Sequence, residues 1–240
     1  AKASFAEQSV IFQRRHNWIM CVLYTGTFGS FIGYSAGFPL LMKTQFPDVN
    51  ALQFAFLGPL VGALSRSMTG WISDKYGGGR VTFWVFLMMI AGVAGVLYFL
   101  AAKNFTGFFA MFMFLFFATG VGNASTFQMI PIIMRQEMPA LMPQLDAQAR
   151  LKQAEKESAA IIGFTSAIAA YGAFFIPKSY GTSIAMTGGP EAALIGFLFF
   201  YVLCAAVTYA VYTRKGGLLH EIERRRAAPA IPNLPQGEPA

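Results

Sequence analysis

Long apolar stretches alternate with short polar segments along the 240 residues of the chain. A helix needs about 20 apolar residues to cross a hydrocarbon core of roughly 30 Å, and six stretches meet that length. The stretches are residues 18–42, 51–72, 81–102, 105–134, 157–177 and 190–213. The pattern therefore predicts an all-α polytopic membrane protein with six transmembrane helices.

The composition agrees with this prediction and reduces the number of function classes to consider. Charged residues make up 12% of the chain and hydrophobic residues 55%, whereas soluble domains carry about 25% charged residues. Cys21 and Cys204 fall within predicted spans, with no paired spacing and no nearby histidine, so neither a disulfide nor a zinc site is expected. The sequence offers no metal cluster, carboxylate dyad or pair of nucleophile and base, so we expect neither an enzyme nor a cofactor.

Basic residues lie mostly on one side of the predicted spans. Fourteen of the eighteen Lys and Arg residues fall in segments 1–17, 73–80, 135–156 and 214–226. The alternate connections hold only Lys43, Lys103 and Lys178. The positive-inside rule places the richer side in the cytoplasm. Both termini are therefore predicted to be cytoplasmic, in a multi-pass membrane protein.

This topology divides the chain into three parts. Residues 1–17 form a cytoplasmic segment, 18–213 the six-helix transmembrane unit, and 214–240 a cytoplasmic tail. The tail is rich in Pro and Ala beyond residue 227 and has little apolar surface, so we expect disorder there. The excess of basic residues on the predicted cytoplasmic side accounts for the net charge of +7. Because the charge is explained in this way, no nucleic-acid partner is expected.

The one remaining basic residue, Arg66, lies inside the second predicted span. It follows Gly58 and Gly62 and precedes Gly70 at intervals of four residues, which places all four on one helical stripe. Asp74, at the end of the span, is eight residues away, or roughly 12 Å of helix rise. An arginine at such depth costs about 2.5–3.5 kcal/mol on insertion scales, so a compensating partner is required.

None of the eleven acidic residues falls inside a predicted span where it could neutralise Arg66. A guanidinium has five donors in a planar arrangement that suits an oxyanion. We therefore expect an anion site in a polar cavity. The alternative is a structural pair with a carboxylate from another chain or from a missing half of the protein.

Five stretches of the chain carry a resemblance to a known family. "GWISDKYGGGR", residues 70–80, resembles the G-x-x-x-D-x-x-G-x-x-R loop of the major facilitator superfamily, in which the acidic and basic residues brace helix ends. "GFTSAIAAYGAFFIPKSYG", residues 163–181, is similar to the second nitrate signature of NarK-type nitrate/nitrite porters. "GTFGSFIGYSAGF" and "GPLVGALSRS" extend the match over most of the chain, as does "GVGNASTFQMIP". The loop residues Asp74 and Arg80 accordingly look structural.

The resemblance implies roles for five residues. In such porters two intramembrane arginines, one from each six-helix half, hold the anion between aromatic side chains, and Arg66 matches the arginine of the second half. The other matches are Tyr24, Phe28, Gly163 and Ser166. Without the resemblance, core packing would be the simpler interpretation of Tyr24 and Phe28. Asn123, a polar residue suited to contact between helices, is left outside the predicted site.

The chain departs from the family in length. It matches only the second six spans of a twelve-helix porter, so the resemblance implies an N-terminal six-helix half that is missing or is a separate chain. Ala169 and Ala173 stand where the signature favours glycine. The expected function is nitrate/nitrite transport, by antiport or anion uptake, in contact with membrane lipid. The alternatives are a carrier for another small oxyanion and a non-transporting membrane scaffold or sensor.

Overall fold

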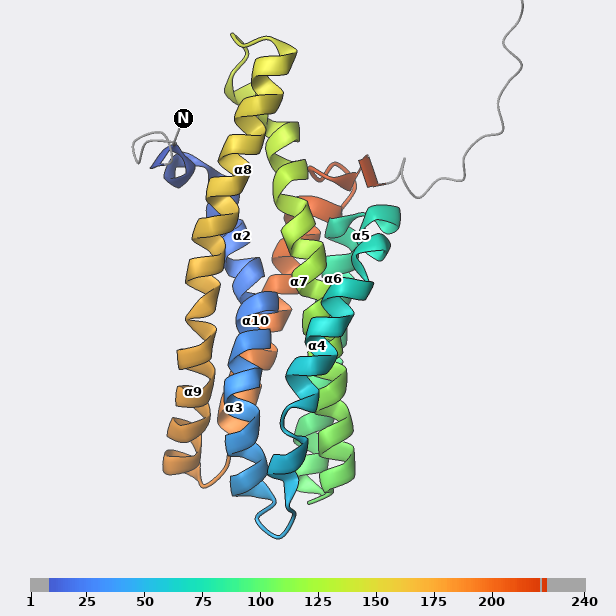
Figure 1. Ribbon diagram of the computed structural model, residues 1–240, viewed down its shortest axis with the longest axis vertical. Helices are drawn as coiled ribbons and strands as arrows, with labels where there is room; N and C mark the ends of the chain where they lie inside the picture. The colour runs from blue at the N-terminus through green and yellow to red at the C-terminus, as the bar shows by residue number, and fades with distance from the viewer. Residues whose placement is uncertain (1–8, 221, 224–240) are drawn as a thin grey trace, which may run out of the picture.

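The structure, a computed structural model, describes residues 9–220, 222 and 223, and all regular structure in this part of the chain is helical. The helices run roughly along the long axis of an elongated bundle (Figure 1). This arrangement confirms the predicted all-α class.

Nine α-helices and four shorter elements make up the described part. The α-helices are α2 (Arg15–Tyr24), α3 (Ser30–Gln45), α4 (Leu57–Met68), α5 (Gly70–Tyr76), α6 (Gly78–Ala101), α7 (Phe105–Leu141), α8 (Ala147–Ala170), α9 (Gly172–Thr187) and α10 (Glu191–Thr208). The 3-10 helices are η1 (Ser9–Gln13) and η3 (Ala51–Phe54), and the π-helices are η2 (Thr25–Gly29) and η4 (Tyr209–Thr213).

Five helical segments in the described part are long and apolar enough to cross a membrane. They are Arg15–Gln45, Gly78–Ala101, Phe105–Leu141, Ala147–Thr187 and Glu191–Thr213. Each contains most of one predicted span. A polytopic membrane protein is thus supported, while a count of six spans is not confirmed.

The predicted span 51–72 differs, because it is not one continuous helix. It contains η3 and the twelve residues of α4, and α5 begins only after a break at Thr69. The Thr69 hydroxyl donates to the Ser65 carbonyl oxygen at 2.6 Å, a local bond of the kind that bends helices. Gly70 follows and has poor helix propensity. Together α4 and α5 still extend from the lower end of the bundle toward its upper end (Figure 1).

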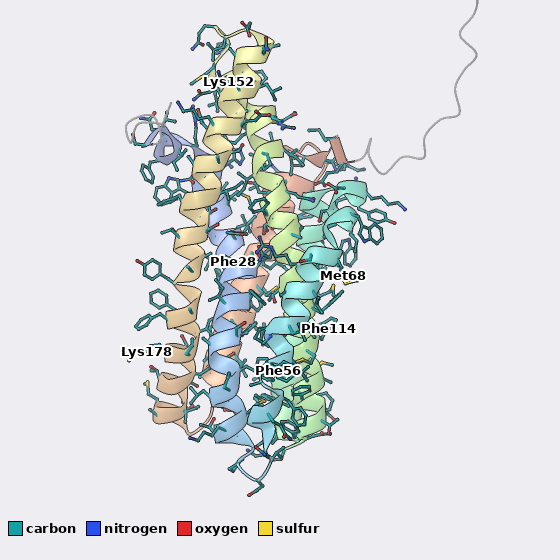
Figure 2. All side chains as sticks on the ribbon, viewed as in Figure 1. Phe28, Phe56, Met68, Phe114, Lys152 and Lys178 are labelled. Atoms are coloured by element: carbon teal, nitrogen blue, oxygen red, sulfur yellow. The ribbon has the colours of Figure 1, made fainter. Side chains whose placement is uncertain are left out.

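The segments predicted to be cytoplasmic share one end of the bundle. The start of α2, the α5–α6 turn, the α7–α8 connection and the residues after α10 lie at the upper end in Figure 1. Figure 2 shows Lys152 near the upper end and Lys178 toward the lower end. The fold therefore separates the two sets of basic residues as the sequence predicts, and the assignment of the upper end to the cytoplasm stays a prediction.

Aromatic rings fill the core between α3 and α7. The Phe38 and Phe112 ring centroids are 4.8 Å apart, and Phe116 lies edge-on to Phe38 at 5.7 Å. Gly58 of α4 faces the Phe116 ring so closely that a Cβ at this position would overlap it. The ring is accommodated because α4 presents glycine there, and α4 can lie directly against α7.

The chain beyond α10 lies against the bundle as far as it is described. Leu219 is buried in the hydrophobic core, and the Glu223 carboxylate accepts a hydrogen bond from the Gly79 backbone N–H at 2.6 Å. The disorder expected beyond residue 227 falls outside the described residues.

Labelling of introduced cysteines tests the orientation of the bundle. Asp48 and Gln144 are exposed at opposite ends, and the native Cys21 and Cys204 are buried. In intact cells we expect a membrane-impermeant maleimide to label Asp48→Cys but not Gln144→Cys. Disrupted cells, in which both should react, provide the control. The reverse pattern in intact cells would contradict the predicted orientation.

Candidate anion site

The position of Arg66 is determined by close contact between α4 and α7. A Cβ on Gly120 of α7 would overlap the Ser65 hydroxyl and the Gly62 carbonyl oxygen of α4. The Ser65 hydroxyl also lies 3.2 Å from the Phe117 carbonyl oxygen, to which it donates. Backbone contact at small residues thus fixes the turn of α4 that carries Arg66.

Arg66 has no acidic partner among the residues that the structure describes. The ion pairs found there are Arg14–Glu157, His16–Glu137, Arg80–Glu223 and Arg135–Glu155. The Arg66 side chain is exposed on the bundle. Its charge is therefore available to a ligand or to a group outside the described chain.

Two predicted aromatic residues lie at a π-helical turn in the middle of the first segment. Tyr24 ends α2 and is buried, and Phe28 lies in η2, half-buried. Their ring centroids are 5.2 Å apart and the ring planes are 25° from parallel. Phe28 lies near mid-height in the bundle (Figure 2). Single π-helical turns within α-helices are frequent at functional sites.

The Tyr24 hydroxyl connects three elements of the predicted site. It lies near Ser166 of α8 and within the electrostatic range of Arg66. The structure therefore brings Arg66, Tyr24 and Ser166 near one another, although they are far apart in sequence. The ring of Phe28 stacks on that of Tyr24.

Gly163 lies one helical turn before Ser166 on α8. It is exposed, and a Cβ added there would meet no atom within 4 Å. Close packing in the described chain thus does not require a glycine at this position. The absence of a side chain instead leaves space beside the Ser166 hydroxyl.

These groups suit a small planar oxyanion. The guanidinium supplies planar donors and positive charge, while the hydroxyls of Tyr24 and Ser166 supply further hydrogen bonds. In the described ranges, no group of three His, Cys, Asp or Glu residues could hold a metal ion. Binding is the chemistry that this arrangement offers.

The predicted loop residues take different positions. Asp74 is exposed and makes no ion pair within the described residues. Arg80 lies 3.8 Å from the carboxylate of Glu223, and Gly77 takes a φ of +94° that favours glycine. Sequence reasoning missed Glu223, because no local pattern links it to a loop 143 residues earlier.

A second ion pair joins the residue before α2 to α8. Arg14 donates to the two Glu157 oxygens at 2.7 and 2.8 Å, and Glu157 is 2% exposed. The hydrogen bonds to Glu157 raise the pKa of Arg14 above its ordinary value. Removing one partner of such a buried pair commonly costs about 3–5 kcal/mol. The pair therefore fixes α2 against α8, the two helices that carry Tyr24 and Ser166.

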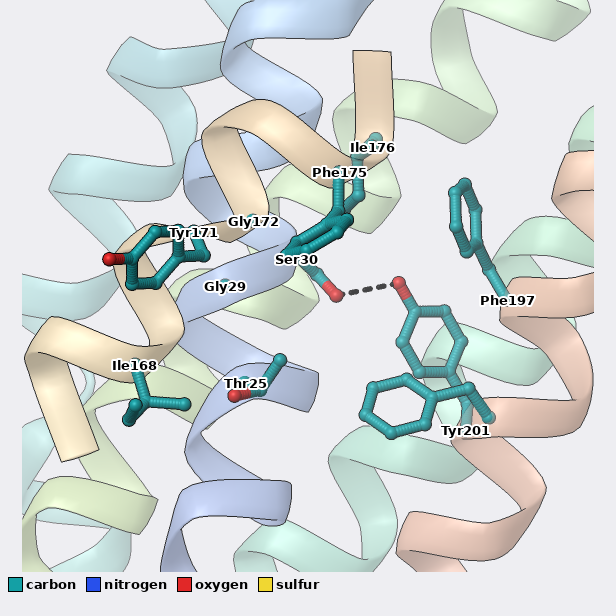
Figure 3. Close-up of a pocket in the computed structure, with 11 residues that line it drawn as sticks. Thr25, Gly29, Ser30, Ile168, Tyr171, Gly172, Phe175, Ile176, Phe197 and Tyr201 are labelled. Atoms are coloured by element: carbon teal, nitrogen blue, oxygen red, sulfur yellow. Dashed lines mark hydrogen bonds between the residues drawn. The ribbon is translucent and has the colours of Figure 1, made fainter. Parts of the chain in front are cut away.

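A cavity of about 620 Å³ lies between η2, α3, α9 and α10. Its walls are mainly apolar, and Tyr201 donates to the Ser30 hydroxyl at 2.8 Å beside it (Figure 3). None of the predicted anion-site residues lines this cavity. Its apolar walls do not suit an anion.

The fold and the candidate site define a polytopic helical membrane protein with an exposed arginine, Arg66, on α4. No family model matches the chain. NarU of Escherichia coli K12, a nitrate/nitrite transporter, is 48% identical over 223 residues, which are 90% of this chain and 48% of the relative. NarU of Salmonella typhimurium LT2 is 50% identical with the same coverage. The probable nitrate/nitrite antiporter NarK2 of Thermus thermophilus is 36% identical over 222 residues, 90% of this chain and 46% of the relative.

The chain is similar to these nitrate/nitrite transporters and antiporters and spans about half the length of the curated relatives that it matches. These similarities confirm the resemblance inferred from the five sequence stretches. The names of these relatives describe transport and not catalysis. The roles of the individual site residues stay predictions.

Two glycine substitutions test which of the two glycines is required for helix packing. We expect Gly120→Ala to lower thermal stability by about 1–3 kcal/mol, because its methyl group overlaps α4. Gly163→Ala should leave stability unchanged, because its methyl group meets open space. Thermal unfolding in detergent measures both. Equal stability of the two variants would contradict the close α4–α7 contact.

Proposed function

We propose that the chain is the C-terminal six-helix half of a nitrate/nitrite porter that works by alternating access in the inner membrane. One observation carries the proposal: the Arg66 guanidinium has no carboxylate partner in the described chain. Its positive charge also interacts electrostatically with the Tyr24 hydroxyl. The printed names of the relatives supply the choice of anion.

Each residue has a distinct role in this proposal. Arg66 neutralises the anion and donates to its oxygens, and the hydroxyls of Tyr24 and Ser166 complete the hydrogen bonds on one side. The Phe28 ring forms a wall of a flat slot that admits a planar anion. Gly163 leaves room for the anion to approach α8.

The second half of the porter completes the site. Arg66 and Gly163 are both exposed in the described chain, so the anion needs a facing wall. An N-terminal six-helix half with its own intramembrane arginine would supply that wall, and lipid would surround the assembly. Twice the length of this chain is also the approximate length of the relatives.

Exchange of one anion for another is the simplest coupling for this site. Proton-driven carriers commonly use intramembrane Asp, Glu or His residues as relays. The predicted spans contain no such residue apart from Glu157 at the start of one span and Glu191 near the start of another, and the first is held by Arg14. Antiport of nitrate and nitrite requires no relay of this kind.

Uptake into proteoliposomes tests the need for a second half. We expect saturable nitrate/nitrite exchange from a chimera that joins this chain to the N-terminal half of the E. coli relative, and none from the isolated chain. A folded chimera that carries another small oxyanion but neither nitrate nor nitrite would favour the alternative carrier. A folded chimera that carries no anion would favour the scaffold or sensor.

In the same chimera, Arg66→Lys should weaken nitrate binding about 30-fold or more, as the loss of a desolvated charged hydrogen-bond pair costs roughly 2–5 kcal/mol. Lysine keeps the charge but lacks the planar set of donors. Arg135→Lys, at an exposed ion pair, is the matched control and should bind normally. Calorimetric titration with nitrate, alongside thermal unfolding, measures both variants.

Near-parental nitrate affinity in a well-folded Arg66→Lys variant would exclude Arg66 as the principal ligand. A structural arginine paired with a carboxylate of the other half predicts a different result. In that case lysine would lower the yield of folded protein more than the affinity for nitrate.

A further inference from the structure

Asn123 is a buried amide without a partner in the middle of α7. It is 1% exposed, and neither its amide nitrogen nor its amide oxygen has a hydrogen-bond partner in the described structure. Burying such a group without hydrogen bonds costs free energy. The structure thus does not support the sequence interpretation of Asn123 as a polar contact between helices.

The neighbouring polar groups of α7 are satisfied. The hydroxyl of Thr119 donates to a carbonyl oxygen of its own helix at 2.9 Å. Ser125 shares a hydrogen bond with Thr82 at 2.7 Å, and Thr126 shares one with Thr27 at 3.0 Å. These hydroxyls account for the polar contacts of α7 with α6 and η2. Asn123 is therefore not needed to hold those helices together.

Helix geometry places Asn123 between the two elements of the anion site. Gly120, three residues earlier, contacts α4 at Gly62, Ser65 and the Arg66 backbone nitrogen. Thr126, three residues later, contacts Thr27 in η2, next to Phe28. Three residues of an α-helix differ by about 60° in direction. Asn123 thus points midway between the helix of Arg66 and the π-helical turn of Phe28.

We infer that Asn123 is a further ligand of the anion site, a role that rests on the proposed function. Its amide N–H donates to the anion held by Arg66 when α4 and η2 rearrange around the substrate. A neutral amide adds hydrogen bonds to a planar oxyanion without adding charge. The Asn123 amide, which has no hydrogen-bond partner in this structure, then gains the bound anion as its partner.

Asn123→Leu tests this inference in the chimera with the N-terminal half of the E. coli relative. Leucine has a similar size and removes both unsatisfied polar atoms. We expect at least tenfold weaker nitrate binding, with a thermal unfolding midpoint equal to or above that of the parent. A merely structural residue would not combine lost affinity with retained stability.

Asn17→Leu is the matched control. Asn17 is also fully buried with an unpartnered amide, but it lies seven residues before Tyr24, roughly 10 Å along the helix. We expect it to keep the parental nitrate affinity. Asn123→Asp, which replaces the donor by an acceptor, should bind nitrate more weakly than Asn123→Leu.

Three outcomes would overturn the inference. Parental affinity in folded Asn123→Leu or Asn123→Asp would remove Asn123 from the site. Loss of the folded state in Asn123→Leu would assign it a structural role. A folded parent chimera that does not bind nitrate would overturn the proposed function itself, and the inference with it.

Discussion

An arginine in a predicted membrane span, such as Arg66, must be balanced by an anion or by polar groups, and the interpretation of the whole structure depends on this constraint. The carboxylates of Glu157 and Glu223 are held at one end of the bundle, by Arg14 and by Gly79 with Arg80. Within the described residues none of the ion pairs includes Arg66. These ion pairs join separate segments of the bundle, and Arg66 lies outside them in the described chain.

Close packing gives that charge its position. The α4 helix lies against α7 because Gly58 admits the ring of Phe116 and because Gly120 admits the backbone of α4. On the other side, the π-helical turn η2 carries Phe28, and Tyr24 directly before it reaches Ser166 of α8. Close contacts at small residues therefore place Arg66 on a face of α4 that is exposed in the described chain.

Local sequence patterns predicted the fold class and several residues of the candidate site. Apolar stretches predicted the helical membrane class, and the lack of an intramembrane acid singled out Arg66. The signature residues Tyr24 and Ser166 came from the resemblance, and the structure brings them together. Hydropathy could not reveal the break at Thr69, because it reports how apolar a stretch is and not where its backbone leaves the helix. Residue spacing identifies only neighbours along one helix. It therefore could not reveal ion pairs between residues 143 positions apart, such as Arg14 and Glu157.

The central claim is that Arg66 binds the transported anion. An experimental structure of the two-half porter with bound nitrate tests it most directly. The account predicts density for a planar anion within hydrogen-bond distance of the Arg66 guanidinium, beside Phe28 and the Tyr24 hydroxyl. A carboxylate of the other half paired with Arg66, with the nitrate bound elsewhere, would contradict it.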